Sequence, residues 1–260
     1  MKVTNEHTIQ SINEYIDLIE NVKTNNVAIG NKADLIFRGQ STDKPLLPKL
    51  ARLTLNGEMA IMEKLMLDEF KRGSLPLTEF KPGNNWDWLA LAQHHGLPTR
   101  LLDWSYSALA ALWFAVQNPP KKDGKGNLEN GVVWILAGLV NDFRTNTEKT
   151  DPLSNKITKI FRSTVVSRRI SAQAGLFTVH KINENGKMIR FETNREFKNK
   201  LTKVIIPHSK FSILRRQLHV LGVNNATIFP DIDGFCRHLE WRFSKYSDEQ
   251  NSKNERSTNR

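Results

Sequence analysis

The chain has 260 residues, of which 39% are hydrophobic and 25% charged, and its formal net charge is +11. It has no apolar run near the roughly 18 residues that a membrane span needs, and residues 1–7 do not read as a signal peptide, so we expect a cytosolic protein. Its single cysteine, Cys236, rules out an internal disulfide and a multi-cysteine zinc site, and we expect it to lie in the core.

The first half of the chain predicts helices that alternate with short strands. Apolar residues at helical spacing predict an amphipathic helix over residues 8–22. A strand over residues 34–41 follows, and we expect Gly39 to break it and to let the backbone approach a ligand. Residues 56–72 predict a second helix, with Leu65 among the side chains that face inward.

Residues 86–116 are the densest part of the sequence, with four of the six tryptophans and two adjacent histidines. A helix over residues 89–95 is expected to stop at Gly96, and a short strand over residues 99–104 follows. The next helix, residues 108–116, is apolar on nearly every face and must be buried. The loop between these helices is therefore held rigidly, which is how folds usually position a functional site.

Polar side chains gather on this loop. Two consecutive histidines cannot face the same side of a helix, so we expect only His95, which adjoins Gly96, to reach a ligand. Arg100 and Asp103 are candidate ligand contacts, but they also fit a structural ion pair beneath the loop. Both interpretations stay open for these two residues.

The second half is richer in predicted strands. Apolar runs predict strands at residues 131–136, 188–192 and 201–206, and a small-residue turn at Gln173 leads into another. A further helix, capped by Ser212, and a last helix that ends near residue 243 complete the pattern. This alternation predicts a single α+β domain.

The basic excess is confined to one half of the chain. Residues 1–130 carry 15 basic and 15 acidic residues, whereas residues 131–260 carry 23 and 12. One positively charged face indicates a polyanionic partner, and we expect RNA. The residues expected to contact it are Arg162, Arg168, Arg169, Arg215 and Arg216. The sequence has no P-loop, no dinucleotide-binding fingerprint and no metal-ligand spacing, so we expect no metal.

Four motifs resemble the FRG-domain family. They are Phe37-Arg-Gly-Gln, Gln93-His-His-Gly-Leu-Pro-Thr-Arg-Leu-Leu-Asp-Trp-Ser, Arg169-Ile-Ser-Ala-Gln-Ala-Gly-Leu-Phe-Thr and Leu221-Gly-Val-Asn-Asn-Ala-Thr-Ile-Phe-Pro-Asp-Ile-Asp-Gly. The resemblance implies an FRG domain over residues 30–243, after an N-terminal helical extension over residues 1–29. Residues 244–260 are almost wholly polar, and we expect a disordered tail. The family is bacterial and phage-borne, with some members in antiviral or toxin-like loci.

The order of these elements is also similar to that of ADP-ribosyltransferases, which have a split β-sheet core and use NAD as a substrate. Carried over, the resemblance implies that Arg38 contacts the pyrophosphate or ribose and that the main chain of Gly39 holds the carboxamide. Arg100 would supply a second phosphate contact. The other residues expected at the NAD site are Gln40, Ser41, His95, Thr99 and Trp104.

The sequence departs from the transferase pattern at one position. Transferases usually place a glutamate where this chain has Gln173, which carries no negative charge. Asp103, or Asp231 and Asp233 if they lie close, would have to replace that acid. The expected catalytic residues are therefore Arg38, Asp103 and Gln173.

Three functions from different classes remain open. The first is an NAD-dependent ADP-ribosyltransferase that modifies nucleic acid, with RNA as the expected acceptor, and acts as a toxin or phage-defence effector restrained by a cognate antitoxin. The second is a non-catalytic module that binds a nucleotide or nucleic acid. The third is a metal-independent nuclease or NAD glycohydrolase with His95 and Asp103 as its acid/base pair.

Overall fold

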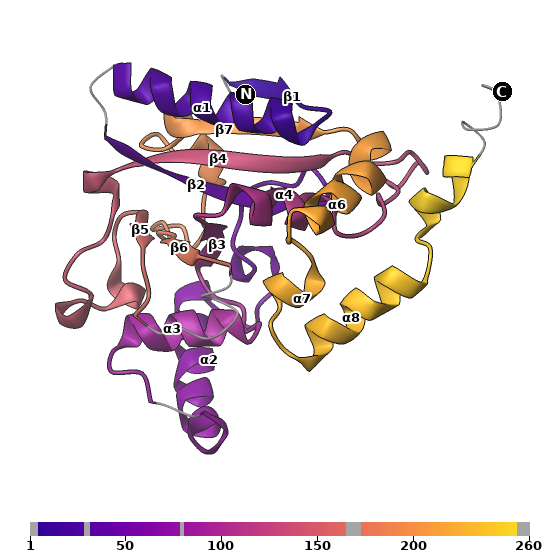
Figure 1. The fold of residues 1–260 in the computed structure, drawn as a ribbon. Helices are drawn as coiled ribbons and strands as arrows, with labels where there is room; N and C mark the ends of the chain where they lie inside the picture. Colours follow the sequence, from indigo (N-terminus) through magenta and orange to yellow (C-terminus); the bar gives the residue numbers. More distant parts are fainter. Residues whose placement is uncertain (1–4, 29–31, 79–80, 165–172, 254–260) are drawn as a thin grey trace.

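The computed structural model describes residues 5–28, 32–78, 81–164 and 173–253 (Figure 1). In these residues the strands are β1 (Glu6–Thr8), β2 (Ala33–Gln40), β3 (Leu101–Ser105), β4 (Gly131–Leu139), β5 (Lys159–Phe161), β6 (Gly175–Val179) and β7 (Leu201–Ile206). The helices are α1 (Ile12–Ala28), α2 (Met59–Ser74), α3 (Asn85–His94), α4 (Ala108–Val116), α6 (Phe211–Val220), α7 (Asn225–Ile228) and α8 (Ile232–Phe243). The predicted α+β class is confirmed.

The described strands form one mixed sheet in the order β1-β7-β4-β2-β3-β6-β5. β1 and β7 are parallel, and the other neighbours are antiparallel. β2 pairs with β4 along its whole length, but it pairs with β3 at one position only, where Phe37 lies opposite Ser105. The sheet is therefore split between β2 and β3.

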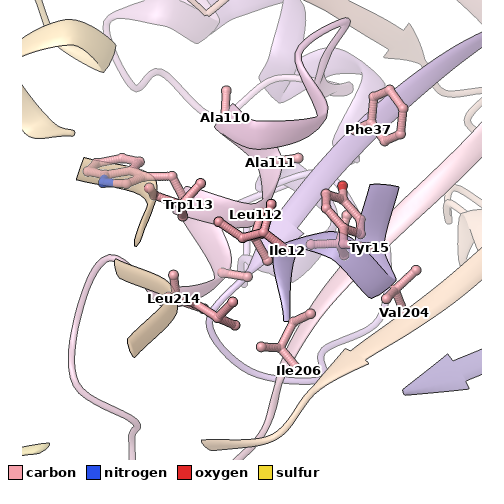
Figure 2. Packing of buried hydrophobic residues seen from close by; sticks show 14 of the residues in the cluster. Ile12, Tyr15, Phe37, Ala110, Ala111, Leu112, Trp113, Val204, Ile206 and Leu214 are labelled. Atoms are coloured by element: carbon pink, nitrogen blue, oxygen red, sulfur yellow. The ribbon is translucent and has the colours of Figure 1, made fainter. Parts of the chain in front are cut away.

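Helices α1, α4 and α6 cover one face of the larger half of the sheet. Figure 2 shows Tyr15 of α1, Leu112 of α4 and Leu214 of α6 gathered against Val204 and Ile206 of β7, all of them fully buried. Ser107 is the N-cap of α4, and its side chain accepts a hydrogen bond from the amide of Ala110. The observed bounds of α4 confirm the helix predicted at residues 108–116.

Helices α2 and α3 cover the smaller half. Trp86 and Leu89 of α3 pack against Leu101 and Val179 of β3 and β6. Because side chains alternate along a strand and Phe37 lies opposite Ser105, the odd-numbered residues of β3 share the face that α4 covers. The end of α3 and the start of α4 therefore flank the split on the same face of the sheet.

Both ends of the described chain are more integrated than the sequence predicted. The expected N-terminal extension contributes β1 to the sheet and α1 to the core. In the expected disordered tail, residues 247–253 form a 3₁₀ turn whose Asp248 and Glu249 pair with Arg215. Among the described helices, none has the length and apolar content to cross a bilayer.

Three local predictions were wrong. The strand β2 continues through Gly39 to Gln40. The predicted strand at residues 188–192 does not form, since residues 188–190 have no regular structure and residues 191–193 form a 3₁₀ turn. On α2 the buried residues include Glu63, which pairs with Arg100, and Leu67, which packs in the apolar cluster of α3, whereas Leu65 is 52% exposed.

Candidate active site at the split of the sheet

A pocket of about 350 Å³ opens where β2 and β3 separate. It is lined by Phe37, Arg38, Gly39, Gln93, His94, Asp103, Trp104, Ser105, Ala111, Phe114, Gln173 and Phe229. The three predicted catalytic residues, Arg38, Asp103 and Gln173, thus line one pocket although they come from three separate motifs. Larger grooves of about 580 and 940 Å³ lie elsewhere and contain none of these three residues.

Arg38 crosses the split of the sheet. Its Nη1 donates to the main-chain oxygen of Asp103 at 2.6 Å and lies 3.7 Å from the Oδ2 atom of that carboxylate. Its Nε is buried and has no hydrogen-bond partner among the described residues. Burial lowers the pKa of the Arg38 guanidinium, and the Asp103 carboxylate opposes this effect. A buried donor without a partner is costly, and Arg38 carries this donor at the lining of the pocket.

Asp103 presents its carboxylate to the pocket. The Oδ2 atom accepts a hydrogen bond of 3.0 Å from Nε2 of Gln93, and Oδ1 receives none from the described residues. The side chain is 55% exposed, in contrast to its buried strand neighbours Leu102 and Trp104. The Oδ2 atom of Asp103 is therefore held by Gln93, and its Oδ1 atom is available to a ligand.

Gln173 and two aromatic rings close the far side of the pocket. The Nε2 of Gln173 donates to the carbonyl oxygen of Ile228 at 3.3 Å, and no described residue bonds its Oε1. Ala174 follows with φ at 46°, a left-handed conformation that is strained for alanine. Phe114 and Phe229 meet edge to face with their centroids 6.2 Å apart, so the wall suits a flat, apolar ring.

Gly39 has a packing role that the sequence did not reveal. A Cβ atom at this position would lie 1.8 Å from the carbonyl oxygen of Ala111 in α4. The glycine therefore lets α4 approach β2 closely. Since β2 pairs with β3 only at Phe37, any backbone group of residues 38–40 that points away from β4 has no partner in β3.

Arg100 is structural, which contradicts its predicted role as a phosphate contact. Its guanidinium is 2% exposed and forms a salt bridge of 2.6 Å with Glu63, while Nη1 donates to the carbonyls of Pro152 and Leu153. The Glu63 carboxylate also accepts from the main-chain amide of Arg100. This pair fixes the start of β3 against α2, and Arg100 does not line the pocket at the split of the sheet.

Several other residues predicted at the NAD site lie outside the pocket lining. The helix α3 ends at His94, which lines the pocket, whereas His95, the histidine expected from the sequence to reach a ligand, is exposed and does not line it. Gln40 accepts from the indole of Trp134, and Ser41 lies beyond the end of β2. Thr99 is fully buried and bonds Gln93 instead of facing the pocket. Of the predicted set, Arg38, Gly39 and Trp104 line the pocket.

The predicted nucleic-acid residues do not form one free basic surface. Arg215 is buried, bonds the carbonyl of Val116 and pairs with Asp248 and Glu249, so its predicted role is wrong. Arg162 is exposed but pairs with Asp34 at 2.8 Å. Arg216 is exposed on α6. Arg168 and Arg169 lie outside the described residues.

Two aspartates and one cysteine considered from the sequence also do not line the pocket. Asp231 caps α8, where it accepts from the amide of Gly234, and Asp233 is exposed on the same helix. Neither lines the pocket, so Asp103 is the carboxylate that does. Cys236 is exposed and not part of the core, because the apolar stripe of α8 faces outward.

Sequence reasoning missed the aromatic wall and the partner of Arg100. Phe229 lies within the fourth motif, and Phe114 lies in the apolar helix over residues 108–116. Both patterns are visible in the sequence, but we interpreted them only as signs of packing and not of a ligand site. Glu63 gave no signal, since a glutamate on an amphipathic helix is usually solvated. In the described part of the chain, no group of three or more His, Cys, Asp or Glu side chains is arranged to hold a metal ion.

The comparisons with known proteins support one part of this picture. Residues 33–124 match the family model of the FRG domain. No curated protein and no solved structure gives a significant match to the chain. The matched stretch supplies β2, α3, β3 and α4, which carry most of the pocket lining. The match confirms the resemblance to the FRG-domain family over these residues.

Proposed function

We propose that this pocket binds NAD and that the protein is an NAD-dependent ADP-ribosyltransferase. The observation that carries the proposal is the Arg38 and Asp103 pair at the split of the sheet. It brings into one pocket a guanidinium whose Nε has no partner among the described residues and a carboxylate whose Oδ1 accepts no hydrogen bond from them. In the transition state the ribose develops positive charge at C1′, which a negative charge beside that atom stabilises. The phosphates or the ribose also need a hydrogen-bond donor.

The volume of the pocket limits how much of the dinucleotide it holds. At about 350 Å³ it lies near the lower end of the roughly 300–1,000 Å³ typical of small-molecule sites. We therefore expect it to enclose the nicotinamide and its ribose, with the nicotinamide ring against Phe114 and Phe229. The phosphates and adenosine would extend outside the pocket.

In the reaction we propose, the bond between C1′ and the nicotinamide nitrogen breaks, and its electron pair leaves with the nicotinamide, which becomes neutral. The carboxylate of Asp103 stabilises the positive charge that develops on the ribose. A lone pair of the acceptor forms the new bond to C1′, and the acceptor then loses its proton to water. Gln173, anchored to Ile228 through Nε2, would accept a ribose hydroxyl at Oε1 and contributes no charge.

We propose a nucleic acid, and RNA in particular, as the acceptor on the ground of charge alone. The whole excess of 11 positive charges lies in residues 131–260. The burial of Arg215 and the pairing of Arg162 weaken this part of the proposal, which therefore depends on the other basic residues of that half. An enzyme that modifies cellular RNA would arrest growth, which fits a toxin or phage-defence role with a cognate inhibitor.

The test is incubation of the protein with labelled NAD and total RNA. We expect label on the RNA, and we expect Asp103→Asn to reduce the transfer rate by about 10²–10³-fold, the usual loss when a transition-state charge is no longer stabilised. Arg38→Ala should have a comparable effect. Asp43→Asn is the matched control, because Asp43 is also a half-exposed, ion-paired aspartate but lies away from the pocket.

Other outcomes would identify the alternatives. Release of nicotinamide without label on RNA would indicate a glycohydrolase, and label on protein alone would replace the proposed acceptor. RNA cleavage without NAD would favour the nuclease, for which His94 rather than His95 is the histidine at the pocket. Binding of NAD or RNA with no reaction would favour the binding module. Full transfer by Asp103→Asn would overturn the assignment of Asp103.

A further inference from the structure

A continuous chain of hydrogen bonds leads from the backbone of β3 to the carboxylate in the pocket. The main-chain N–H of Leu101 donates to Oγ1 of Thr99 at 3.1 Å, and the Thr99 hydroxyl donates to Oε1 of Gln93 at 2.7 Å. The Nε2 of Gln93 then donates to Oδ2 of Asp103 at 3.0 Å. Thr99 is fully buried, so water does not compete for its hydroxyl.

The direction of each bond in this chain follows from its two ends. An ionised carboxylate only accepts, so the NH₂ end of the Gln93 amide faces Asp103 and its carbonyl end faces Thr99. A carbonyl oxygen also only accepts, so the Thr99 hydroxyl donates its single hydrogen to Gln93 and accepts from the backbone N–H of Leu101. The amide orientation is fixed by this chemistry and is not an arbitrary choice between oxygen and nitrogen.

Asp103 needs such support. Its side chain is 55% exposed, and the 3.7 Å between its Oδ2 and Nη1 of Arg38 exceeds hydrogen-bond length. Gln93 is thus the described residue that holds the carboxylate by a direct hydrogen bond, and it lines the pocket beside it. A catalytic group must be held within about 0.5 Å of its productive position, and a displacement of 1 Å costs about 10²-fold in rate.

We propose that Gln93, anchored by Thr99, is the positioning residue that fixes the orientation of Asp103 for catalysis. The proposal rests on the transfer reaction proposed above. It gives Thr99 and Gln93 a role through Asp103, which differs from the direct contact with NAD that the sequence predicted for Thr99. The relay is built from the second motif, so three of its conspicuous polar residues act as one unit.

Two substitutions of Thr99 separate its hydroxyl from its shape. Thr99→Val keeps the volume and removes the hydroxyl, whereas Thr99→Ser keeps the hydroxyl and removes a methyl group. We expect Thr99→Val to lower kcat by about tenfold with KM within about twofold, and Thr99→Ser to retain most of the activity. Gln93→Leu should lower kcat by about 10²-fold. Thermal melts confirm that each variant is folded.

A double-mutant cycle shows whether Gln93 acts through Asp103. In the Asp103→Asn background, Gln93→Leu should cause no further loss, because the group that it positions is already gone. Additive losses would overturn the proposal. A raised KM with unchanged kcat in Gln93→Leu would also overturn it, since that result indicates a direct ligand contact.

A second readout does not depend on NAD. The side-chain amide signals of Gln93, assigned in a ¹⁵N spectrum by their loss in Gln93→Leu, should shift in Thr99→Val and in Asp103→Asn. They should stay in place in Asp43→Asn. If the wild-type protein neither binds nor cleaves NAD, the proposed function fails, and these shifts still decide whether the relay exists. Unchanged signals in Thr99→Val would overturn the relay itself.

Discussion

Gly39 illustrates how one residue can serve packing where the sequence indicated ligand binding. Replacing it by alanine would place a methyl group 1.8 Å from the carbonyl oxygen of Ala111, so α4 would have to move away from β2. We expect Gly39→Ala to lower the free energy of unfolding by about 3 kcal/mol or more, as measured by urea denaturation.

Gly73 provides the matched control. It lies within α2, and nothing is within 4 Å of the position that its Cβ would take. We expect Gly73→Ala to stabilise the protein by about 0.5–1 kcal/mol, because alanine loses less backbone entropy in a helix. A Gly39→Ala protein of wild-type stability that merely loses NAD binding would show that the glycine serves the ligand instead.

The buried pair of Glu63 and Arg100 gives a second prediction at the residue scale. Removing one partner leaves an unpaired buried charge, so Glu63→Ala should destabilise the protein by about 3–5 kcal/mol. Replacing both residues by leucine should recover much of that loss. Urea denaturation of the single and double variants measures this. A folded Arg100→Met protein with unchanged stability and weakened NAD binding would restore the role that the sequence predicted for Arg100.

The sequence predicted the candidate site better than the roles of its neighbours. Arg38 and Asp103 lie in the strands on either side of the split and Gln173 lies in the turn before β6, so that all three line one pocket, and local patterns reveal each of these elements. An arginine in a loop looks the same whether a ligand or a buried glutamate neutralises it. The partner of Arg100 lies 37 positions earlier in the chain, and no pattern in one sequence connects the two.

At the scale of elements, predictions succeeded where the pattern is local. The apolar helix α4 and the strand β7 are both marked by continuous runs and appear at their predicted bounds. The orientation of α6 was not predicted, since Arg215, which we expected to contact RNA, is buried and Ile213 is 46% exposed. That orientation depends on Asp248 and Glu249 some thirty residues later, so helical periodicity alone did not reveal it.

The 3₁₀ turn after α8 is expected to stabilise the whole fold through Arg215. A chain truncated after residue 246 would leave that guanidinium buried without Asp248 and Glu249, at a cost of about 3–5 kcal/mol. Truncation after residue 253 keeps both acids and should leave stability unchanged. Thermal unfolding of the two truncated proteins tests this, and equal melting temperatures would show that the pairing contributes little.

At the scale of the molecule, the pocket joins two parts of the chain. The FRG match ends at residue 124, yet Gln173 and Phe229, which close the pocket, come from beyond it. Phe229 immediately follows α7, and Figure 1 shows α7 leading into α8 at the side of the molecule. The pocket described here therefore needs the second half of the chain as well as the matched stretch.

The opposite face of the sheet contains a buried histidine, His180. The indole of Trp104 donates to Oγ1 of Thr178, and that hydroxyl also shares a hydrogen bond of 2.9 Å with Nε2 of His180. Burial, together with the charge of Arg38, lowers the pKa of His180 from 6.5 to about 3.

This histidine should make the whole protein sensitive to acid. Above pH 6.5 the ring is neutral in both the folded and unfolded states and has no effect. As the pH falls from 6.5 towards 3, the unfolded chain binds a proton that the folded protein does not. The free energy of unfolding should therefore fall by about 1.4 kcal/mol per pH unit, to about 5 kcal/mol in total. Urea denaturation across this range measures the slope for the wild type and for His180→Gln, which cannot titrate. We expect a shallower slope for the variant, and parallel slopes would show that His180 takes up its proton in the folded protein.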